Sequence, residues 1–205
     1  MSNELAGASR YALSFTSGAL LAREALVALP LYHRTGNWAV VRQLIGKDNL
    51  LQARTVSSGF RLAREVAQRL AVLTDTELDL LADASATERG YLMWAAACRR
   101  YAFIGEFADE VVRERFVLLT RTLTHDDFNA FVRGKALWHP ELDELKESTL
   151  KKLRAVVFRM LTEAGLLTDE GGIVPVVLSE RLVDAFADHE PSDLRFFPTI
   201  QGGAR

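Results

Sequence analysis

Two segments of the sequence gather side chains that bind phosphate groups and base edges. The first segment reads RTVSSGFRLAREVAQRL and supplies Arg54, Ser57, Ser58, Arg61, Arg64 and Gln68. The second reads STLKKLRAVVFRM and supplies Ser148, Thr149, Lys151, Lys152, Arg154 and Arg159. Arginine, lysine, glutamine and serine all donate hydrogen bonds to the acceptors of a nucleic acid. Both segments are therefore candidate nucleic-acid contacts.

The apolar spacing of the first segment predicts a helix with a polar outer face. Leu62, Val66 and Leu70 follow one another at four-residue intervals and fall on one side of a helix. Arg61, Arg64 and Gln68 project from the opposite side. We expect the hydroxyl groups of residues 55–58 to cap this helix, and we expect it to start near Gly59.

The second segment predicts a helix of the same plan. At 100° per residue its apolar positions share one side, and Lys151, Lys152 and Arg159 share the other, with Arg154 at the boundary. We expect Ser148 or Thr149 to cap this helix. The positive end of a capped helix can also receive a phosphate group.

A short helix and a turn are predicted before the first basic segment. A helix over residues 17–29 should stop at Pro30, and a second helix over residues 38–45 should end at Gly46. A tight, turn-rich connection, GKDN, leads toward the basic helix. Residues 10–73 thus have the order of a helix-turn-helix-like region.

Residues 74–123 are predicted to form a central helical spine. TDTELDLLADA reads as a short acidic helix, and residues 88–119 read as a long apolar-rich helical stretch. Gly105 is expected to interrupt that stretch, because glycine weakens a helix interior by roughly 1 kcal/mol relative to alanine.

Residues 124–198 are predicted to be winged-helix-like. Thr124 and Asp127 have the spacing of a helix cap, and the helix should end at Gly134 or at residues 138–140. A short helix over residues 140–146, the second basic helix and a β-hairpin around residues 169–172 follow, and SERLVDAFAD closes the region. The acidic hairpin tip departs from a DNA-gripping wing. We expect residues 199–205 to be a disordered tail.

The fold class expected from these patterns is mainly α, with a helix-turn-helix-like N-terminal part and a winged-helix-like C-terminal part joined by long central helices. The chain of 205 residues has a formal net charge of −2, yet residues 1–70 hold nine Lys/Arg against four Asp/Glu. The near-neutral total therefore hides a basic N-terminal third, which favours contact with a polyanion.

Other classes of protein find little support in the sequence. The nucleotide-binding glycine loops and the G-x-S-x-G nucleophile motif are missing. The cluster of His125, Asp126 and Asp127 is explained more simply by acidic residues stabilising the start of a helix than by binding of a metal ion. We expect no enzymatic activity, metal or cofactor. No apolar run approaches the roughly 20 residues that cross a bilayer, and no secretory signal is recognisable. With its single Cys98, the chain is expected to be cytoplasmic.

Five ordered blocks resemble a known family. They are SFTSGALLAREA, DNLLQARTVSSGFRLAREVAQRL, CRRYAFIGEFADEVVRERF, HDDFNAFVRGKA and STLKKLRAVVFRMLTEAGLL, and with a closing FFP they span about residues 13–198. They look like the BrxA family of BREX phage-defence systems. The resemblance implies a non-catalytic anti-phage component, helical with helix-turn-helix-like and winged-helix-like parts, that binds DNA. The family has also been likened to NusB-type RNA-binding factors.

The leading hypothesis is a protein without enzymatic activity that binds double-stranded DNA mainly through the phosphate backbone, with affinity that falls steeply as salt rises. Three alternatives stay open. A Lys/Arg helix face is often only solvated. The basic helices could instead dock other BREX proteins, including the methyltransferase or the ATPase, because winged helices also bind proteins. RNA is the third alternative and ranks below DNA, because the winged-helix order favours a helix that reads a groove.

Overall fold

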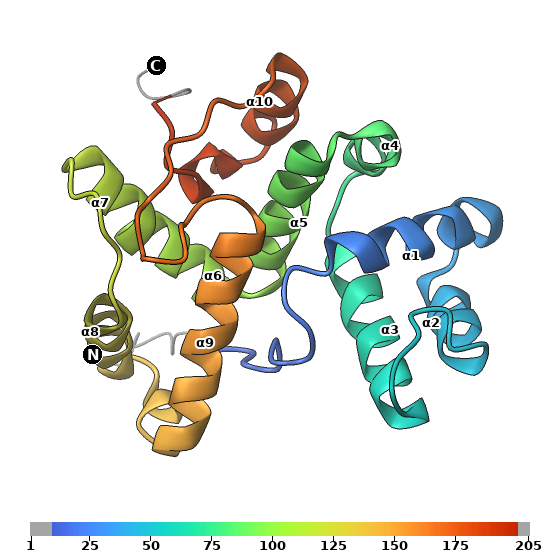
Figure 1. Cartoon of the computed structure of the whole chain (residues 1–205), viewed down its shortest axis with the longest axis horizontal. Coiled ribbons are helices and arrows are strands. Elements are labelled where there is room, and N and C mark those ends of the chain that lie inside the picture. The colour runs from blue at the N-terminus through green and yellow to red at the C-terminus, as the bar shows by residue number, and fades with distance from the viewer. Residues whose placement is uncertain (1–9, 201–205) are drawn as a thin grey trace, which may run out of the picture.

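The computed structural model describes residues 10–200, and these residues are mainly helical, as predicted (Figure 1). A π-helical turn covers Ala108–Arg113, and short 3-10 turns cover Pro140–Leu142 and Asp193–Phe196. The α-helices are α1 (Ala22–Thr35), α2 (Trp38–Lys47), α3 (Val56–Leu70), α4 (Asp75–Asp83), α5 (Ala86–Arg100), α6 (Ala102–Phe107), α7 (Glu114–Val117), α8 (His125–Ala136), α9 (Glu147–Glu163) and α10 (Glu180–Ala187).

The first three helices pack together as one group, on the right of Figure 1. The predicted bounds of α1 were wrong at both ends, since the helix begins at Ala22 and continues through Pro30. Leu21 precedes it in the left-handed conformation, with φ of 63°, and this delays the start. Pro30 is exposed, so water can satisfy the carbonyl group that its missing N–H leaves unpaired.

The connection from α2 to α3 is longer than the predicted tight turn. Residues 48–55 separate the two helices, and Asn49 closes this loop by bonding both the N–H and the carbonyl group of Ala53. α3 then begins at Val56 instead of near Gly59. Its cap is Thr55, whose hydroxyl accepts from the Ser58 N–H, while the Ser58 hydroxyl accepts from the Thr55 N–H. Ser57 caps nothing and is exposed in the first turn.

The central spine breaks at Tyr101 and not at Gly105. Tyr101 has an extended backbone between α5 and α6. Gly105 lies inside α6, where a Cβ atom would come within 2.9 Å of the Cys98 carbonyl oxygen. The glycine therefore permits a close approach of two helices and does not interrupt one. The predicted acidic helix is α4, capped by Thr74 with Glu77.

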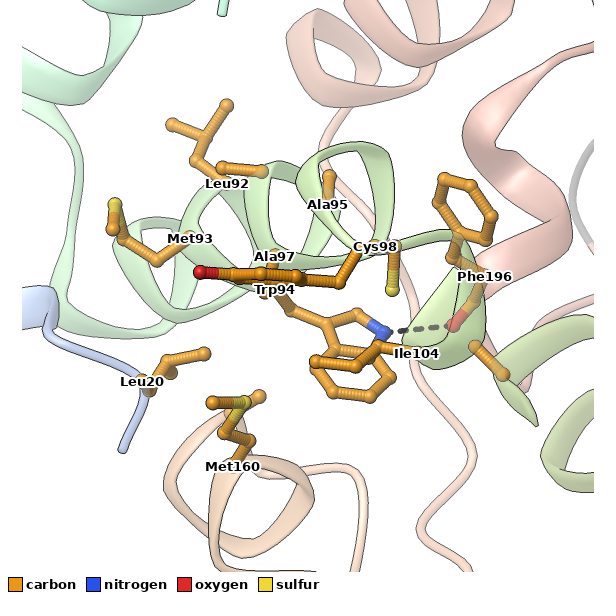
Figure 2. Close-up of a cluster of buried hydrophobic side chains, with 14 of the residues drawn as sticks. Leu20, Leu92, Met93, Trp94, Ala95, Ala97, Cys98, Ile104, Met160 and Phe196 are labelled. Atoms are coloured by element: carbon orange, nitrogen blue, oxygen red, sulfur yellow. Dashed lines mark hydrogen bonds between the residues drawn. The ribbon is translucent and has the colours of Figure 1, made fainter. Parts of the chain in front are cut away.

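The core is built around α5, which lies between the first three helices and the C-terminal half. Figure 2 shows Trp94 among buried apolar side chains, with Leu20 and Met160 on one side of it. The indole N–H of Trp94 donates to the carbonyl oxygen of Phe196 at 2.9 Å. Residues far apart in the sequence thus share one apolar core. Within residues 10–200, no helix is both long and apolar enough to cross a lipid bilayer.

The C-terminal region contains little β-structure. Thr124 and Asp127 cap α8 as predicted, but the predicted end was wrong, because the helix continues through Gly134 and ends at Ala136, before residues 138–140. The short helix expected over residues 140–146 is a single 3-10 turn. The two β-prone runs meet at one bridge, Leu167 with Ile173, and a second bridge joins Thr122 to Gly172. The winged-helix-like arrangement of residues 124–198 stays a prediction. The proposed boundaries after residues 73, 123 and 198 also stay predictions.

Of the tail expected over residues 199–205, Thr199 is buried, and residues 201–205 lie outside the described part of the chain.

Candidate nucleic-acid interface

The outer face of α3 brings four of the predicted residues together. At 100° per residue, Ser57, Arg61, Arg64 and Gln68 fall within an arc of roughly 60°. Ser57, Arg61 and Arg64 are exposed, and Gln68 is half-buried. Arg54 is exposed in the loop immediately before the helix. The periodicity of the sequence therefore placed this polar arc correctly.

The inner face of α3 is fixed to the body by a buried ion pair. Arg69 Nε donates to Glu65 Oε1 at 2.9 Å, and the Tyr101 hydroxyl donates to both Glu65 oxygens at 2.8 Å. Burial, together with the neighbouring Glu65 carboxylate, raises the pKa of Tyr101 to about 12, so the phenol keeps its proton. The guanidinium group of Arg69 also donates to the carbonyl groups of Ala19 and Leu20. The outer arc consequently sits on a helix whose orientation is set.

Positive charge is in excess on α1, α2 and α3. Residues 22–70 hold eight Lys/Arg against three Asp/Glu, a net charge of +5. One of the eight is Arg69, which is paired with Glu65. For the other seven, no carboxylate of residues 10–200 lies within ion-pair distance: Arg23, Arg34, Arg42, Lys47, Arg54, Arg61 and Arg64. We call the exposed parts of α1, α2, α3 and the loop before α3 that carry these seven residues the basic surface.

The predicted residues of α9 are more nearly neutralised. Lys151 Nζ lies 2.7 Å from Glu147 Oε1, and Arg159 Nε lies 2.8 Å from Glu163 Oε1. Arg154 donates to the side chain of Asn129 at 3.1 Å. Lys152 is exposed, and within residues 10–200 no carboxylate pairs with it. Residues 124–198 hold nine Lys/Arg against fourteen Asp/Glu, so α9 belongs to an acidic region.

The capping expected for α9 is also wrong. The residue before the helix is Lys146, which makes no side-chain cap. Ser148 and Thr149 lie inside the first turn and are exposed. Glu147 is the first residue of the helix, where its negative charge interacts favourably with the positive end of the helix dipole. Its carboxylate also forms an ion pair with Lys151. An acidic first turn opposes binding of a phosphate group at this helix end.

The segment that leads into α1 connects the two basic helices. Figure 1 shows this segment between α3 and α9, which both begin at the lower edge of the view. The Leu20 N–H donates to Glu163 Oε2 on α9 at 2.9 Å, and the Ala19 carbonyl group accepts from Arg69 on α3. A hollow of about 680 Å³ at this junction is lined by Arg23, Leu62 and Arg159, among other residues. Arg159 is thus the predicted α9 residue that shares a hollow with a residue of α3.

Three residues beside the arc were not predicted from the sequence. Arg42 lines a hollow of about 300 Å³ together with Arg64 and Phe60. Lys47 and Phe60 line a second hollow, of about 670 Å³, between α2 and α3. The two cations on the short α2 could have been recognised from the positive charge of the N-terminal third. Nothing in the sequence showed that the Phe60 ring would be exposed between them.

The part of the chain that the structure describes contains no group of three or more His, Cys, Asp or Glu side chains arranged to hold a metal ion.

Known relatives cover most of the chain. A protein named BREX protein BrxA from Escherichia coli O9:H4 (strain HS) is 27% identical over 148 residues, which are 72% of this chain and 70% of that protein. The BREX protein BrxA from Bacillus cereus (strain H3081.97) is 27% identical over 132 residues, 64% of this chain and 66% of that protein. The chain therefore spans about two thirds of the length of these relatives.

The fold matches a solved structure as well. A crystal structure of an uncharacterized protein from Magnetospirillum magneticum superimposes with a TM-score of 0.80 and 23% sequence identity, covering 92% of this chain and 99% of the other. The helical arrangement is therefore shared with that protein. The family model for BrxA matches residues 9–190, nearly the whole chain. This protein belongs to the BrxA family.

Proposed function

We propose that this protein is a non-enzymatic component of a BREX-type defence system and binds double-stranded DNA through the basic surface. The observation that carries the proposal is the set of seven cations on α1, α2 and the loop and helix of α3, none paired with a carboxylate of residues 10–200. A cation already held by a carboxylate gains little from a phosphate group. An unpaired one releases condensed counterions from DNA when it binds.

The shape of α3 suits the major groove of DNA. The groove is about 12 Å wide and admits one α-helix, whose N-terminal residues approach the base edges. The exposed arc of α3 begins at Ser57 in the first turn and continues through Arg61 and Arg64. Arg42 and Lys47 on α2 lie beside this arc, where they can contact the flanking phosphate groups.

The distribution of charge supports one orientation on DNA. Residues 71–123 hold six Lys/Arg against nine Asp/Glu, and residues 124–198 are also acidic. A duplex therefore attracts the first three helices and repels most of the remaining surface. In this arrangement α9 contributes less than α3, and Lys152 is its most available cation.

The names of the relatives support the BREX assignment. Both quoted relatives are called BREX protein BrxA, and the family match covers the helices that carry the basic surface. The resemblance noted in the sequence is to a non-catalytic DNA-binding component, which agrees with a surface built for a polyanion.

A polarisation titration with a labelled duplex of about two helical turns tests the proposal. If five of the cations contact phosphate groups, the logarithm of the affinity should fall against the logarithm of the salt concentration with a slope of about −4.5. An affinity that does not change between about 50 and about 200 mM salt would contradict phosphate contact. Structured RNA of equal length, added as competitor, distinguishes a DNA-binding from an RNA-binding protein.

An adaptor role is a second candidate, favoured by an exposed apolar surface far from the basic residues in the sequence. Leu118 and Leu119 are exposed after α7, and Val177 is exposed after the β-bridges. A hollow of about 500 Å³ among Phe116, Ile173 and Pro175 adjoins Leu119. Co-purification of other BREX proteins after nuclease treatment, lost in a Leu118→Ser/Leu119→Ser variant, would support this role. Association that disappears with nuclease treatment would contradict it.

A further inference from the structure

Two apolar side chains stand exposed in the first two turns of α3, beside the polar arc. Val56 is 73% exposed and Phe60 is 45% exposed, and their four-residue spacing places them on one side of the helix. Phe60 lies one turn before Arg64, and Val56 directly precedes Ser57. This apolar pair therefore flanks the residues that the proposed function brings to the DNA.

The ring of Phe60 is held in place by α2. A Cβ atom at Gly46 would come within 2.4 Å of the Phe60 ring, so the ring lies directly over the glycine of the neighbouring helix. Gly46 itself is buried. The absence of a side chain at Gly46 thus lets the Phe60 ring pack on α2, while nearly half of the Phe60 surface stays exposed to solvent. A ring held in this way loses little conformational freedom when it binds a ligand.

Positive charge lies beside Phe60. Phe60 lines one hollow with Lys47 and another with Arg42 and Arg64. Of the three carboxylates in residues 22–70, Glu65 is buried against Arg69, Glu24 lies on α1, and Asp48 lies in the loop after α2. An apolar contact framed by cations is complementary to a ligand that combines a polyanionic backbone with a small apolar group.

The major groove of DNA offers one such group. Among the base edges exposed there, the C5-methyl group of thymine is the prominent apolar feature. We propose that Val56 and Phe60 pack against thymine methyl groups in the major groove, so that the protein prefers sites that contain thymine at the positions facing the start of α3. This inference rests on the proposed function and adds a source of sequence preference to the phosphate contacts.

Replacement of thymine by uracil in the labelled duplex tests the inference. Deoxyuridine keeps the base pair and the O4 acceptor and lacks only the methyl group. The unmodified protein should bind the thymine duplex more tightly, by roughly fourfold for each methyl group buried. The ratio of the two affinities should fall toward one in Phe60→Ala and in Val56→Ala. The second variant protects the test against misfolding, because Val56 is largely exposed.

A control substitution can be made far from α3 in the sequence. Val177 is 86% exposed outside the basic surface, so Val177→Ala should keep the full ratio. Thymine and uracil duplexes bound equally, with steep salt dependence retained, would overturn the inference and leave the proposed function standing. A ratio that survives in both α3 variants would overturn the assignment to these residues. Failure to bind either duplex would overturn both the inference and the proposed function.

Discussion

Glu65 and Arg69, one turn apart on α3, form a buried ion pair whose other bonds reach two distant parts of the chain. Glu65 accepts from the Tyr101 hydroxyl at the end of α5, and Arg69 donates to carbonyl groups in the segment before α1. The pair therefore joins the helix that carries the polar arc to the spine and to the entry segment. The orientation of the proposed DNA-binding face depends on it.

Removal of one partner of this pair should be strongly destabilising. Arg69→Met leaves Glu65 charged and buried, and breaking a buried pair on one side costs about 3–5 kcal/mol. Urea denaturation should show this loss in the free energy of unfolding. Arg64→Ala, which removes an exposed and unpaired arginine of the same helix, should change the stability by less than about 0.5 kcal/mol. Equal losses in the two variants would contradict a structural role for the buried pair.

The polar arc of α3 should dominate DNA affinity. Arg61→Ala/Arg64→Ala should reduce the slope of the salt dependence by about 2, because each lost phosphate contact removes about one released counterion. Lys151→Ala/Lys152→Ala removes the same charge from α9 and is the matched control. We expect its effect to be smaller, because Lys151 is already paired with Glu147. A larger effect of the α9 variant would move the interface to the C-terminal region.

Gly46 should be required for the position of Phe60. Alanine is favoured over glycine in a helix by roughly 0.5–1 kcal/mol, but its Cβ atom would come within 2.4 Å of the Phe60 ring. Overpacking of this kind costs about 1–3 kcal/mol, so Gly46→Ala should be destabilising overall and should also reduce the preference for thymine.

A double variant separates these two effects of Gly46→Ala. In a Phe60→Ala background the clash is gone, and Gly46→Ala should become neutral or stabilising. The coupling between the two positions is measured by a double-mutant cycle of unfolding free energies. Additive effects of the two substitutions would show that the ring and the glycine are not in contact in solution.

Glu88 should make folding sensitive to acid. Hydrogen bonds from Arg181, from the Ser85 N–H and from Ser179 hold the pKa of the Glu88 carboxyl group well below its ordinary value of 4.5. A carboxyl group whose pKa is lowered by folding stabilises the folded state above the unfolded pKa, and that contribution is lost as the pH falls through the folded pKa. Unfolding free energies measured from pH 7 downward should decrease less steeply in Glu88→Gln than in the unmodified protein. Parallel pH profiles would contradict the assignment.

Features that depend on neighbours within one helical turn could be predicted from the amino-acid order. The polar arc of α3, the two faces of α9 and the cap of α8 by Thr124 and Asp127 all follow from three- and four-residue spacing. The pairing of Lys151 with Glu147 has the same spacing and could have been recognised in the same way. The excess of positive charge in the N-terminal third was likewise a property of the chain alone.

Which of those positive side chains have no carboxylate partner, and what surrounds them, depends on how the helices pack in three dimensions. Contacts between different helices produce the break of the spine at Tyr101 and the close approach at Gly105. They also produce the packing of the Phe60 ring over Gly46. Arg69 likewise donates to the carbonyl groups of Ala19 and Leu20, which no spacing within its own helix could predict. Local spacing assigns a residue to a face of its own helix, but close packing of the neighbouring helices decides whether that face meets solvent, a carboxylate or another backbone.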